Sequence, residues 1–230
     1  MRAFLCLLSL ASAALASDKP WRLPEIAKSH QEKNQTLDCY DLRAFGGKHV
    51  TFTENTFDLA TYEFDDMISS CCFYGIWIFY DEPDYNMNNL DAAVYLKWGE
   101  NACYTVDTEF NNRASSIRLA GAPDDYKQDS LNLYEGRLFM GKEQYFDEDA
   151  PQITEKNLGA SAIVSGCSPW TIYADANYQG ESICLQPRTD TPDCYPTFFF
   201  EPAEIGPLAS NVSSIRRGCF AKNKRFGRTL

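Results

Sequence analysis

The stretch Phe64-Asp-Asp-Met-Ile-Ser-Ser-Cys-Cys-Phe-Tyr-Gly-Ile-Trp-Ile-Phe-Tyr80 decides the fold of this chain. It joins an acidic turn, in which two residues separate two aspartates from two serines, to an apolar run that ends on a tyrosine. Aspartate and serine favour a turn, and the β-branched and aromatic residues after it favour a strand. The turn recurs as Asn111-Asn-Arg-Ala-Ser-Ser116, which indicates an internal repeat.

The tyrosine at the end of this stretch begins a second repeated pattern. An aromatic residue, four residues, a second aromatic, one residue and a glycine describe residues 40–47, 134–141 and 173–180. Residues 80–87 keep both aromatics but have Met87 in place of the glycine. The pattern predicts a folded β-hairpin with two packed rings and a glycine conformation that a side chain would penalise. We therefore expect Met87 to strain or remodel the second hairpin.

Hairpins and turns alternate four times along the chain. Residues 157–162 and 209–214 give the remaining turns, as Asn-Leu-Gly-Ala-Ser-Ala and Ala-Ser-Asn-Val-Ser-Ser. Short aromatic and β-branched runs broken by Gly, Asp, Asn and Pro are typical of an all-β sandwich. The spacing groups the four units into two tandem pairs, so we expect two β domains at residues 39–124 and 130–220, joined by a short linker.

The two ends of the chain differ from this repetitive body. Residues 1–16 predict a secretory signal peptide, with Arg2 before a short apolar run and a small-x-small pattern at residues 14–16. We therefore expect a secreted, extracellular protein with a loosely docked leader at 17–38 and a frayed basic tail at 221–230. No later stretch approaches the roughly twenty apolar residues of a membrane-spanning helix, so no membrane insertion is expected.

The charge of the chain limits the classes of function. The formal net charge is −11, and loss of Arg2 with the signal takes it to −12. An acidic body repels phosphates, which argues against nucleic-acid binding and fits a protein that holds cations. Neither His30 nor His49 lies in a nucleophile, zinc-peptidase or phosphate-loop motif, so we expect no enzymatic activity.

The cysteines indicate disulfides. After Cys6 leaves with the signal, each predicted domain holds four: Cys39, Cys71, Cys72 and Cys103, then Cys167, Cys184, Cys194 and Cys219. An even number in a secreted chain favours structural disulfides within each domain, and zinc is the competing interpretation, although no C-x-x-C pair occurs. Asn34 and Asn211 begin glycosylation sequons.

Alignment of the units suggests where some cysteines lie. Strand alternation places Cys71 in the core and Cys72 outward or toward the leader, and we expect Cys39 to pair with one of them. Cys167 and Cys219 fall at equivalent positions of the third and fourth units in this alignment, so they could approach each other.

The four hairpins, each followed by a serine-containing turn, resemble the βγ-crystallin superfamily over residues 39–219. The resemblance implies two β-sandwich domains, each built from two Greek keys with eight strands. It also implies that a serine in each turn packs its hydroxyl against the folded hairpin of a neighbouring motif. The secretory signal and the cysteines differ from the cytosolic vertebrate lens proteins, so a refractive lens role is the weakest of the functions considered.

Residues 65–70 and 111–116 fit the calcium signature of this family: two Asp or Asn, two arbitrary residues, Ser or Thr, then Ser. Calcium prefers six to eight oxygen ligands. By resemblance, one site uses the Asp66 side chain, the Met67 carbonyl and the Ser115 hydroxyl, the other uses the Asn112 side chain, the Arg113 carbonyl and the Ser69 hydroxyl, and the carbonyls of Asp41 and Asp81 complete the protein ligands. Asp and Asn are also ordinary turn residues, so these turns can form without an ion.

The second domain departs from the signature. Leu158 stands at the second acidic position and Ala209-Ser210 replace the other pair, so weak calcium binding or none is expected there.

The sequence therefore favours a non-enzymatic, secreted, disulfide-stabilised calcium-binding protein with a structural or extracellular role. The alternative is a secreted defence or inhibitor module that binds a protease, a microbe or a glycan, so a protein or glycan partner stays open. Residues 186–207, with Thr197-Phe-Phe-Phe200, are the candidate loop for that alternative, although a core strand is the simpler interpretation of the phenylalanines.

Overall fold

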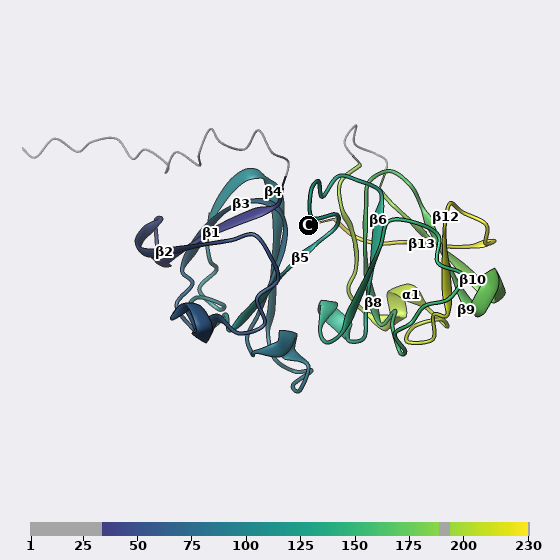
Figure 1. The fold of residues 1–230 in the computed structure, drawn as a ribbon, viewed down its shortest axis with the longest axis horizontal. Helices are drawn as coiled ribbons and strands as arrows, with labels where there is room; N and C mark the ends of the chain where they lie inside the picture. The colour runs from purple at the N-terminus through teal and green to yellow at the C-terminus, as the bar shows by residue number, and fades with distance from the viewer. Residues whose placement is uncertain (1–33, 189–193, 230) are drawn as a thin grey trace, which may run out of the picture.

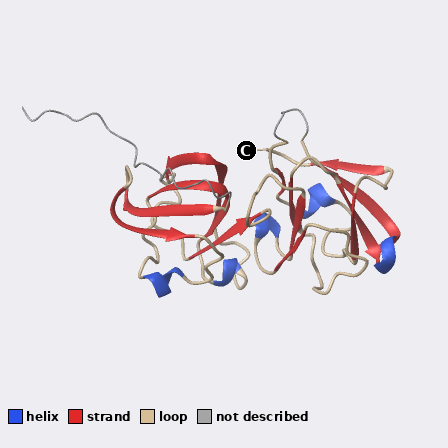
Figure 2. Ribbon diagram, turned by 45° about the horizontal axis from the view of Figure 1, so that its top comes forward, coloured by secondary structure: helices blue, strands red, loops and turns tan. Residues whose placement is uncertain are grey.

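The computed structural model describes residues 34–188 and 194–229, which form two β domains lying side by side (Figure 1). The helical segments are short and lie in the connections between strands (Figure 2).

The first domain contains β1 (Thr36–Leu42), β2 (Gly46–Phe52), β3 (Ser70–Tyr80), β4 (Val94–Thr105) and β5 (Ser116–Ala120), with the 3₁₀ turns η1 (Leu59–Tyr62) and η2 (Asp84–Asn86). The second contains β6 (Ser130–Tyr134), β7 (Glu143–Phe146), β8 (Ser161–Ser165), β9 (Trp170–Asp175), β10 (Gln179–Gln186), β11 (Thr197–Phe199), β12 (Ser214–Arg217) and β13 (Asn223–Phe226), with η3 (Arg137–Phe139), η4 (Ala176–Tyr178) and the helix α1 (Pro202–Ile205). The all-β prediction with two Greek-key domains is confirmed, but the described first domain has five strands rather than the eight that the resemblance implied, whereas the second has eight.

Strand β3 joins the two Greek keys of the first domain. Its first half pairs with β1, its second half pairs with β5, and β4 pairs with both halves. The register shifts at Gly75, which has φ +117°, a conformation that side chains rarely adopt. The apolar part of the stretch 64–80, from Ser70 to Tyr80, is therefore a single strand that passes from one key into the next.

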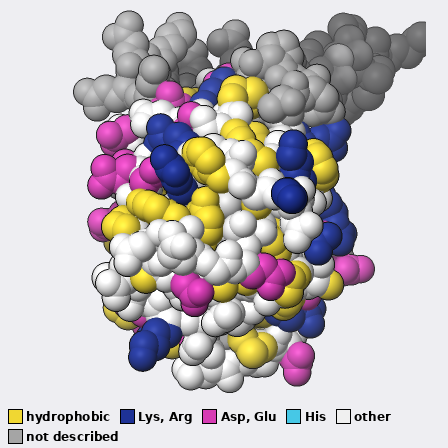
Figure 3. All heavy atoms as spheres, turned by 90° about the vertical axis from the view of Figure 1, so that its right-hand side faces the viewer, with side chains coloured by type: hydrophobic (Ala, Val, Ile, Leu, Met, Phe, Trp, Pro, Cys, Tyr) yellow, Lys and Arg dark blue, Asp and Glu magenta, His cyan; other side chains and the backbone are white. Residues whose placement is uncertain are grey.

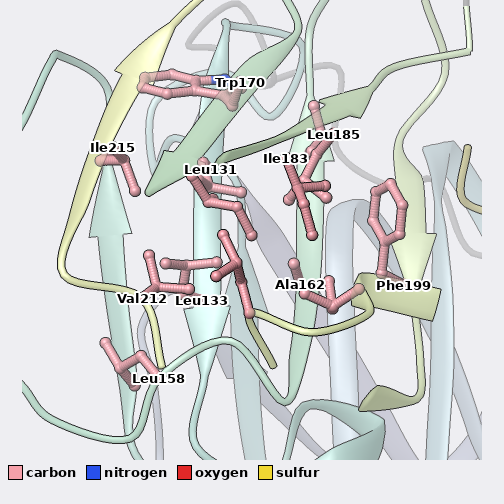
Figure 4. Packing of buried hydrophobic residues seen from close by; sticks show 14 of the residues in the cluster. Leu131, Leu133, Leu158, Ala162, Trp170, Ile183, Leu185, Phe199, Val212 and Ile215 are labelled. Carbon is pink, nitrogen blue, oxygen red and sulfur yellow. The ribbon is translucent and has the colours of Figure 1, made fainter. Parts of the chain in front are cut away.

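The second domain closes its core between two four-stranded sheets, ordered β12-β9-β10-β13 and β11-β8-β6-β7. Apolar side chains of both sheets meet between them, including Leu131, Trp170, Ile183 and Ile215 (Figure 4). Phe199 belongs to the same cluster. Strand β11 therefore confirms the core-strand interpretation of the phenylalanines, and Phe198 and Phe199 are buried rather than presented on a loop.

One serine in each unit holds the folded hairpin. The hydroxyls of Ser70, Ser116, Ser161 and Ser214 donate to the carbonyls of Leu42, Glu82, Gly136 and Asp175 at 2.7, 2.7, 2.6 and 2.7 Å. The same hydroxyls accept from the N–H groups of Phe45, Tyr85, Phe139 and Tyr178 at 2.9, 3.1, 2.9 and 3.0 Å. Each serine thus binds the hairpin of its own unit, so the expectation of a neighbouring motif was wrong.

These bonds also correct the alignment of the third unit. Ser161 makes the bonds of the last serine in the signature, so the third turn spans residues 156–161 rather than 157–162. The second position is therefore Asn157, not Leu158. Gly166, with φ +72°, takes the place of Gly75 and Gly121, so the assignment of Cys167 to that position was wrong as well.

The second hairpin is remodelled, as the missing glycine predicted. Gly47, Gly141 and Gly180 have φ values of +82°, +75° and +79°, whereas Met87 has φ −56°. Asn86 takes the left-handed conformation instead, with φ +58°, which asparagine tolerates well. Its side chain accepts from the N–H of Glu82 at 2.8 Å and donates to the carbonyl of Ala93 at 3.0 Å.

The eight cysteines of the described residues all form disulfides within their own domain, as expected. The pairs are Cys39–Cys71, Cys72–Cys103, Cys167–Cys194 and Cys184–Cys219. Cys71 is a core residue and pairs with Cys39, but Cys72 is buried as well, because β4 lies beside it and supplies Cys103. Cys167 and Cys219 do not pair with each other. The expectation that they could approach each other came from the one-residue error in the alignment of the third unit.

Both ends of the folded body extend further than expected. Strand β1 begins at Thr36, inside the segment assigned to the leader, and the Gln35 side chain donates to the carbonyls of Ala120 and Ala122 at 2.7 and 2.9 Å. The basic segment is not a frayed tail, because β13 pairs in parallel with β10. The rest of the proposed leader and the signal segment lie outside the described residues.

The two domains share a buried interface. Ile76, Ile78 and Tyr80 of β3 lie in one apolar cluster with Tyr134 and Phe139 of the second domain. The Tyr80 hydroxyl donates to the carbonyl of Phe139 at 2.6 Å. This interface fixes the relative position of the domains.

Arg118 crosses the same interface. Its Nη2 donates to the carbonyl of Gly141 at 3.0 Å, and its Nε lies 3.2 Å from Glu143 Oε2. Burial raises the pKa of Glu143, and Arg118 opposes that rise. A buried charge is tolerated only when it is paired, so each of these residues requires the other.

Removal of a hairpin serine should destabilise the fold. Ser161→Ala leaves the buried N–H of Phe139 and the carbonyl of Gly136 without this partner, and an unpaired buried polar group costs about 1–3 kcal/mol. Chemical denaturation should therefore show a loss of that order. Ser182→Ala is the control, because the Ser182 hydroxyl makes no hydrogen bond to a described residue. Equal stability of both variants would contradict the role of the serine.

Asp129 holds the turn after β8 and should make stability depend on pH. Burial by itself would raise its pKa, but hydrogen bonds from the Ser168 hydroxyl and from the N–H groups of Ser168 and Cys167 outweigh burial and lower the pKa. The ionised carboxylate is thus favoured in the folded chain. Its stabilising contribution is complete above the ordinary aspartate pKa and is lost as pH falls through the lowered value.

Asp129→Asn should therefore lower the free energy of unfolding most near neutral pH. The gap between wild type and variant should narrow below about pH 4, where the carboxylate becomes protonated. Urea denaturation across a pH series measures this gap. A gap that is the same at every pH would show that the charge of Asp129 contributes nothing.

Candidate metal centre

The two predicted calcium turns of the first domain, residues 65–70 and 111–116, face each other. Asp66 and Asn112 both adopt the left-handed conformation, with φ values of +53° and +57°. The N–H of Asp66 donates to the carbonyl of Ala114, and the N–H of Asn112 donates to the carbonyl of Ile68, both at 3.0 Å. This reciprocal pair of bonds relates the turns by an approximate twofold axis. Residues more than forty positions apart in the sequence are therefore brought together.

The predicted ligands around Asn112 converge. The Ser69 hydroxyl donates to Asn112 Oδ1 at 2.7 Å, and the N–H of Ser69 donates to the carbonyl of Tyr40, next to Asp41, at 2.9 Å. In the same two units, Asp41 Oδ1 and Asn111 Oδ1 are buried without a hydrogen-bond partner among the described residues. Buried oxygen acceptors without donors suit a water molecule or a cation. The residues present therefore fit a hard cation.

The predicted ligands around Asp66 also lie near one another, but the positively charged side chain of Arg113 lies in the same region. The N–H of Ser115 donates to the carbonyl of Tyr80, next to Asp81, at 2.8 Å. The Arg113 guanidinium binds the Asp81 carboxylate through two hydrogen bonds, of 2.8 Å from Nε and 2.5 Å from Nη2. An ion in this site would share its surroundings with Arg113.

The acidic surroundings of Asp66 favour a counterion. Partial burial raises the pKa of Asp66, the negative charges of Asp65 and Asp81 raise it further, and Arg113 lowers it. A raised carboxylate pKa means that the anion is unfavourable in its surroundings. A bound cation would relieve that cost.

The remodelled hairpin is linked to the position of Asp81. In the first and fourth hairpins the carboxylates of Asp41 and Asp175 lie over the hairpin glycine, where a Cβ would clash with them. The second hairpin has Met87 at that position, and there Asp81 pairs with Arg113 instead. The sequence pattern located Met87 but gave no sign of this ion pair.

The donor set of both predicted sites is poor in negative charge. No group of three or more His, Cys, Asp or Glu side chains that could hold a metal ion occurs in residues 34–188 and 194–229. Each predicted site instead combines one carboxylate or amide with a hydroxyl and two carbonyls. Such oxygen donors suit calcium rather than a softer metal, and the described cysteines are occupied by disulfides.

The second domain repeats part of this geometry. Asn157 and Ser210 take the left-handed conformation, with φ values of +62° and +59°, at the positions of Asp66 and Asn112. A hollow there is lined by Asn157, Asp175, Ser213 and neighbouring residues. The sequence analysis placed Asn157 at the first position of this turn, because it matched Ser161 to the first of the two serines in the other turns. Alignment on the serine that binds the hairpin places Asn157 at the second position. Ala160 replaces the hydroxyl that Ser69 and Ser115 supply.

The two sequon asparagines are accessible. Asn34 and Asn211 are both exposed. No helix among the described residues has the length and apolar character needed to cross a bilayer.

Comparison with known proteins agrees with this architecture. The family model described as Beta/Gamma crystallin matches residues 36–120 and 130–217. Gamma-crystallin N of Mus musculus is 24% identical over 152 residues, which cover 62% of this chain and 72% of that protein. Beta-crystallin B1 of Homo sapiens is 23% identical over 192 residues, which cover 80% of this chain and 69% of that protein.

A solved structure shares the two-domain fold. The structure of Geodin, a beta-gamma crystallin from Geodia cydonium, matches with a TM-score of 0.62 and 20% identity over 80% of this chain and 99% of that chain. At this identity the likeness establishes the fold alone.

Proposed function

Because the chain belongs to the βγ-crystallin family, we propose that it is a secreted, non-enzymatic protein that binds calcium through its first domain and has a structural, extracellular role. The observation that carries the proposal is the meeting of the turns at residues 65–70 and 111–116, with the Ser69 hydroxyl 2.7 Å from Asn112 Oδ1. One ion would be held by Asp66, Met67, Ser115 and Asp81, and the other by Asn112, Arg113, Ser69 and Asp41. The carbonyl ligands are Met67, Arg113, Asp41 and Asp81.

Secretion is supported by the signal-like residues 1–16 and by four disulfides, which persist in oxidising compartments. Calcium would join segments that are distant in sequence and would bind the folded chain rather than the unfolded chain. Such binding stabilises the fold by mass action. In this proposal calcium has a structural role.

A second candidate is the defence or inhibitor module, in its glycan-binding form. A hollow beside β4 is lined by aromatic and charged side chains, among them Trp98, Glu100 and Tyr104. Aromatic faces and charged groups together suit a sugar ring. Glycan-array binding that disappears in Trp98→Ala would favour this candidate over a purely structural role.

Calcium titration tests the leading proposal. Wild type should bind two ions in the micromolar range or more weakly, within the roughly 10⁻⁷ to 10⁻³ M span of protein sites. Asp66→Gly and Asn112→Gly should each remove one ion while keeping the left-handed backbone, which glycine adopts without strain. Calorimetry measures both stoichiometry and affinity.

Asn157→Gly in the second domain is the matched control and should leave both ions bound. Melting temperatures should also rise with calcium and return with chelator. Equal melting temperatures in millimolar calcium and in chelator would contradict the stabilising role of calcium.

We expect the positive charge of Arg113 to weaken calcium binding at the Asp66 site. Arg113→Ala removes a positive charge that lowers the pKa of Asp66 and binds Asp81, so calcium should bind more tightly, by up to about tenfold for an exposed charge. Arg43→Ala, at another exposed arginine of the domain, should change the affinity little. Weaker calcium binding in Arg113→Ala would instead mean that the Arg113–Asp81 pair organises the site.

A further inference from the structure

The end of the chain carries a charge opposite to that of the rest. Residues 205–230 contain no Asp or Glu and six cations: Arg216, Arg217, Lys222, Lys224, Arg225 and Arg228. The remaining residues hold 21 − 6 = 15 cations and 32 acids, a net charge of −17. A local net charge of +6 on an otherwise acidic protein is a strong asymmetry.

Strand pairing collects part of this charge on one face of the second domain. Arg216 of β12 lies opposite Thr171, Thr171 lies opposite Cys184, and Cys184 lies opposite Lys224 of β13. Paired residues in neighbouring strands project to the same face of a sheet. The alternate residues of β9 and β10 fill the core, so Arg216 and Lys224 lie on the outer face.

Two exposed phenylalanines accompany these cations. Phe226 lies opposite Gln186, two residues beyond Lys224 on the same face, and is 72% exposed. Phe220 is 56% exposed, and the Arg216 guanidinium lies 4.3 Å from the centre of its ring. Figure 3 shows this side of the molecule, with Lys and Arg side chains interspersed among hydrophobic ones on its upper part.

The segment that carries Phe220 is held against the sheet. The Cys184–Cys219 disulfide ties it to β10. The N–H of Phe220 donates to Thr171 Oγ1 at 2.9 Å, and the Thr171 hydroxyl donates to the carbonyl of Gly218 at 2.6 Å. Phe220 is thus exposed on a fixed segment rather than on a loose end.

Several of the cations have no acidic partner. Lys222, Lys224 and Arg225 form no ion pair with another described residue, whereas Arg216 lies 3.4 Å from Asp149 and Arg228 lies 2.6 Å from Glu204. Exposed cations are well hydrated and need no partner, but cations that lie beside exposed aromatic rings give this surface both charge and apolar area to offer to a partner. We call the surface formed by Arg216, Phe220, Lys222, Lys224 and Phe226 the basic face.

We propose that the basic face docks on the surface of an anionic lipid bilayer. Cations near such a surface gain about 1 kcal/mol each from the lipid charge, and aromatic side chains favour the boundary between headgroups and acyl chains. The acidic body does not prevent this contact, because exposed charges farther than about 8 Å away are screened at physiological salt. The protein would lie on the bilayer without spanning it.

Two other occupants fit the face less well. A soluble polyanion would pair with the cations but would leave Phe220 and Phe226 exposed to water. A second copy docking through the same face would place like charges opposite each other, which opposes pairing. Of the three occupants, only the surface of an anionic bilayer can contact both the cations and the exposed phenylalanines favourably.

Vesicle cosedimentation of the mature, disulfide-bonded chain tests the proposal. The protein should bind phosphatidylcholine vesicles that contain phosphatidylglycerol, should not bind phosphatidylcholine alone, and should dissociate as salt is raised. Lys224→Glu and Phe226→Ser should each weaken binding roughly tenfold, because one reverses a surface charge and the other removes an interfacial side chain.

Arg43→Glu and Phe57→Ser are matched controls, since both residues are exposed in the first domain and Phe57 is 57% exposed. These variants should bind as wild type does, and melting temperatures verify that all four variants fold. Three results would overturn the proposal. They are equal binding to neutral and anionic vesicles, binding to heparin but not to anionic vesicles, and self-association that is lost in Lys224→Glu in the absence of any vesicle binding.

Discussion

The hydrogen bonds of a single serine in each unit are the constraint on which the fold depends. The hydroxyl accepts from one hairpin N–H and donates to one hairpin carbonyl, so it satisfies two backbone groups that the folded hairpin withdraws from its strand ladder. Because the serine begins a core strand, it also fixes the register of that strand. A one-residue slip would turn core side chains such as Ala162 outward, so the hairpin and the core are specified together.

The same construction brings the two turns of the first domain together, and it does so without requiring an ion. Asp66, Asn112, Asn157 and Ser210 all adopt the left-handed conformation, although their side chains differ in their capacity to bind calcium. The fold thus supplies a common scaffold with the backbone already in place. The identities of the side chains and of their neighbours, such as Arg113 beside Asp81, determine which copies could hold a cation.

Position in the fold also determines what each basic residue does. Arg118 and Arg216 occupy equivalent positions, two residues after the hairpin serines Ser116 and Ser214. Arg118 faces the second domain and is buried against Glu143, with its guanidinium 3.8 Å from the ring of Tyr85. Arg216 faces neither domain among the described residues and is partly exposed beside Phe220. Identical side chains therefore stabilise an interface in one unit and form an open surface in the other.

The sequence by itself determined the four hairpins, their grouping into two domains, the confinement of disulfides to each domain and the remodelling caused by Met87. These features follow from local spacing and from turn chemistry, which require no knowledge of distant neighbours. The tertiary structure alone decided the register of the third turn, the partners of the cysteines, the pairing of Arg113 with Asp81 and the place of β13 beside β10. Each of these is a contact between segments far apart in the chain. Such contacts depend on which strands become neighbours when the core closes, and residue type and spacing leave several neighbours possible.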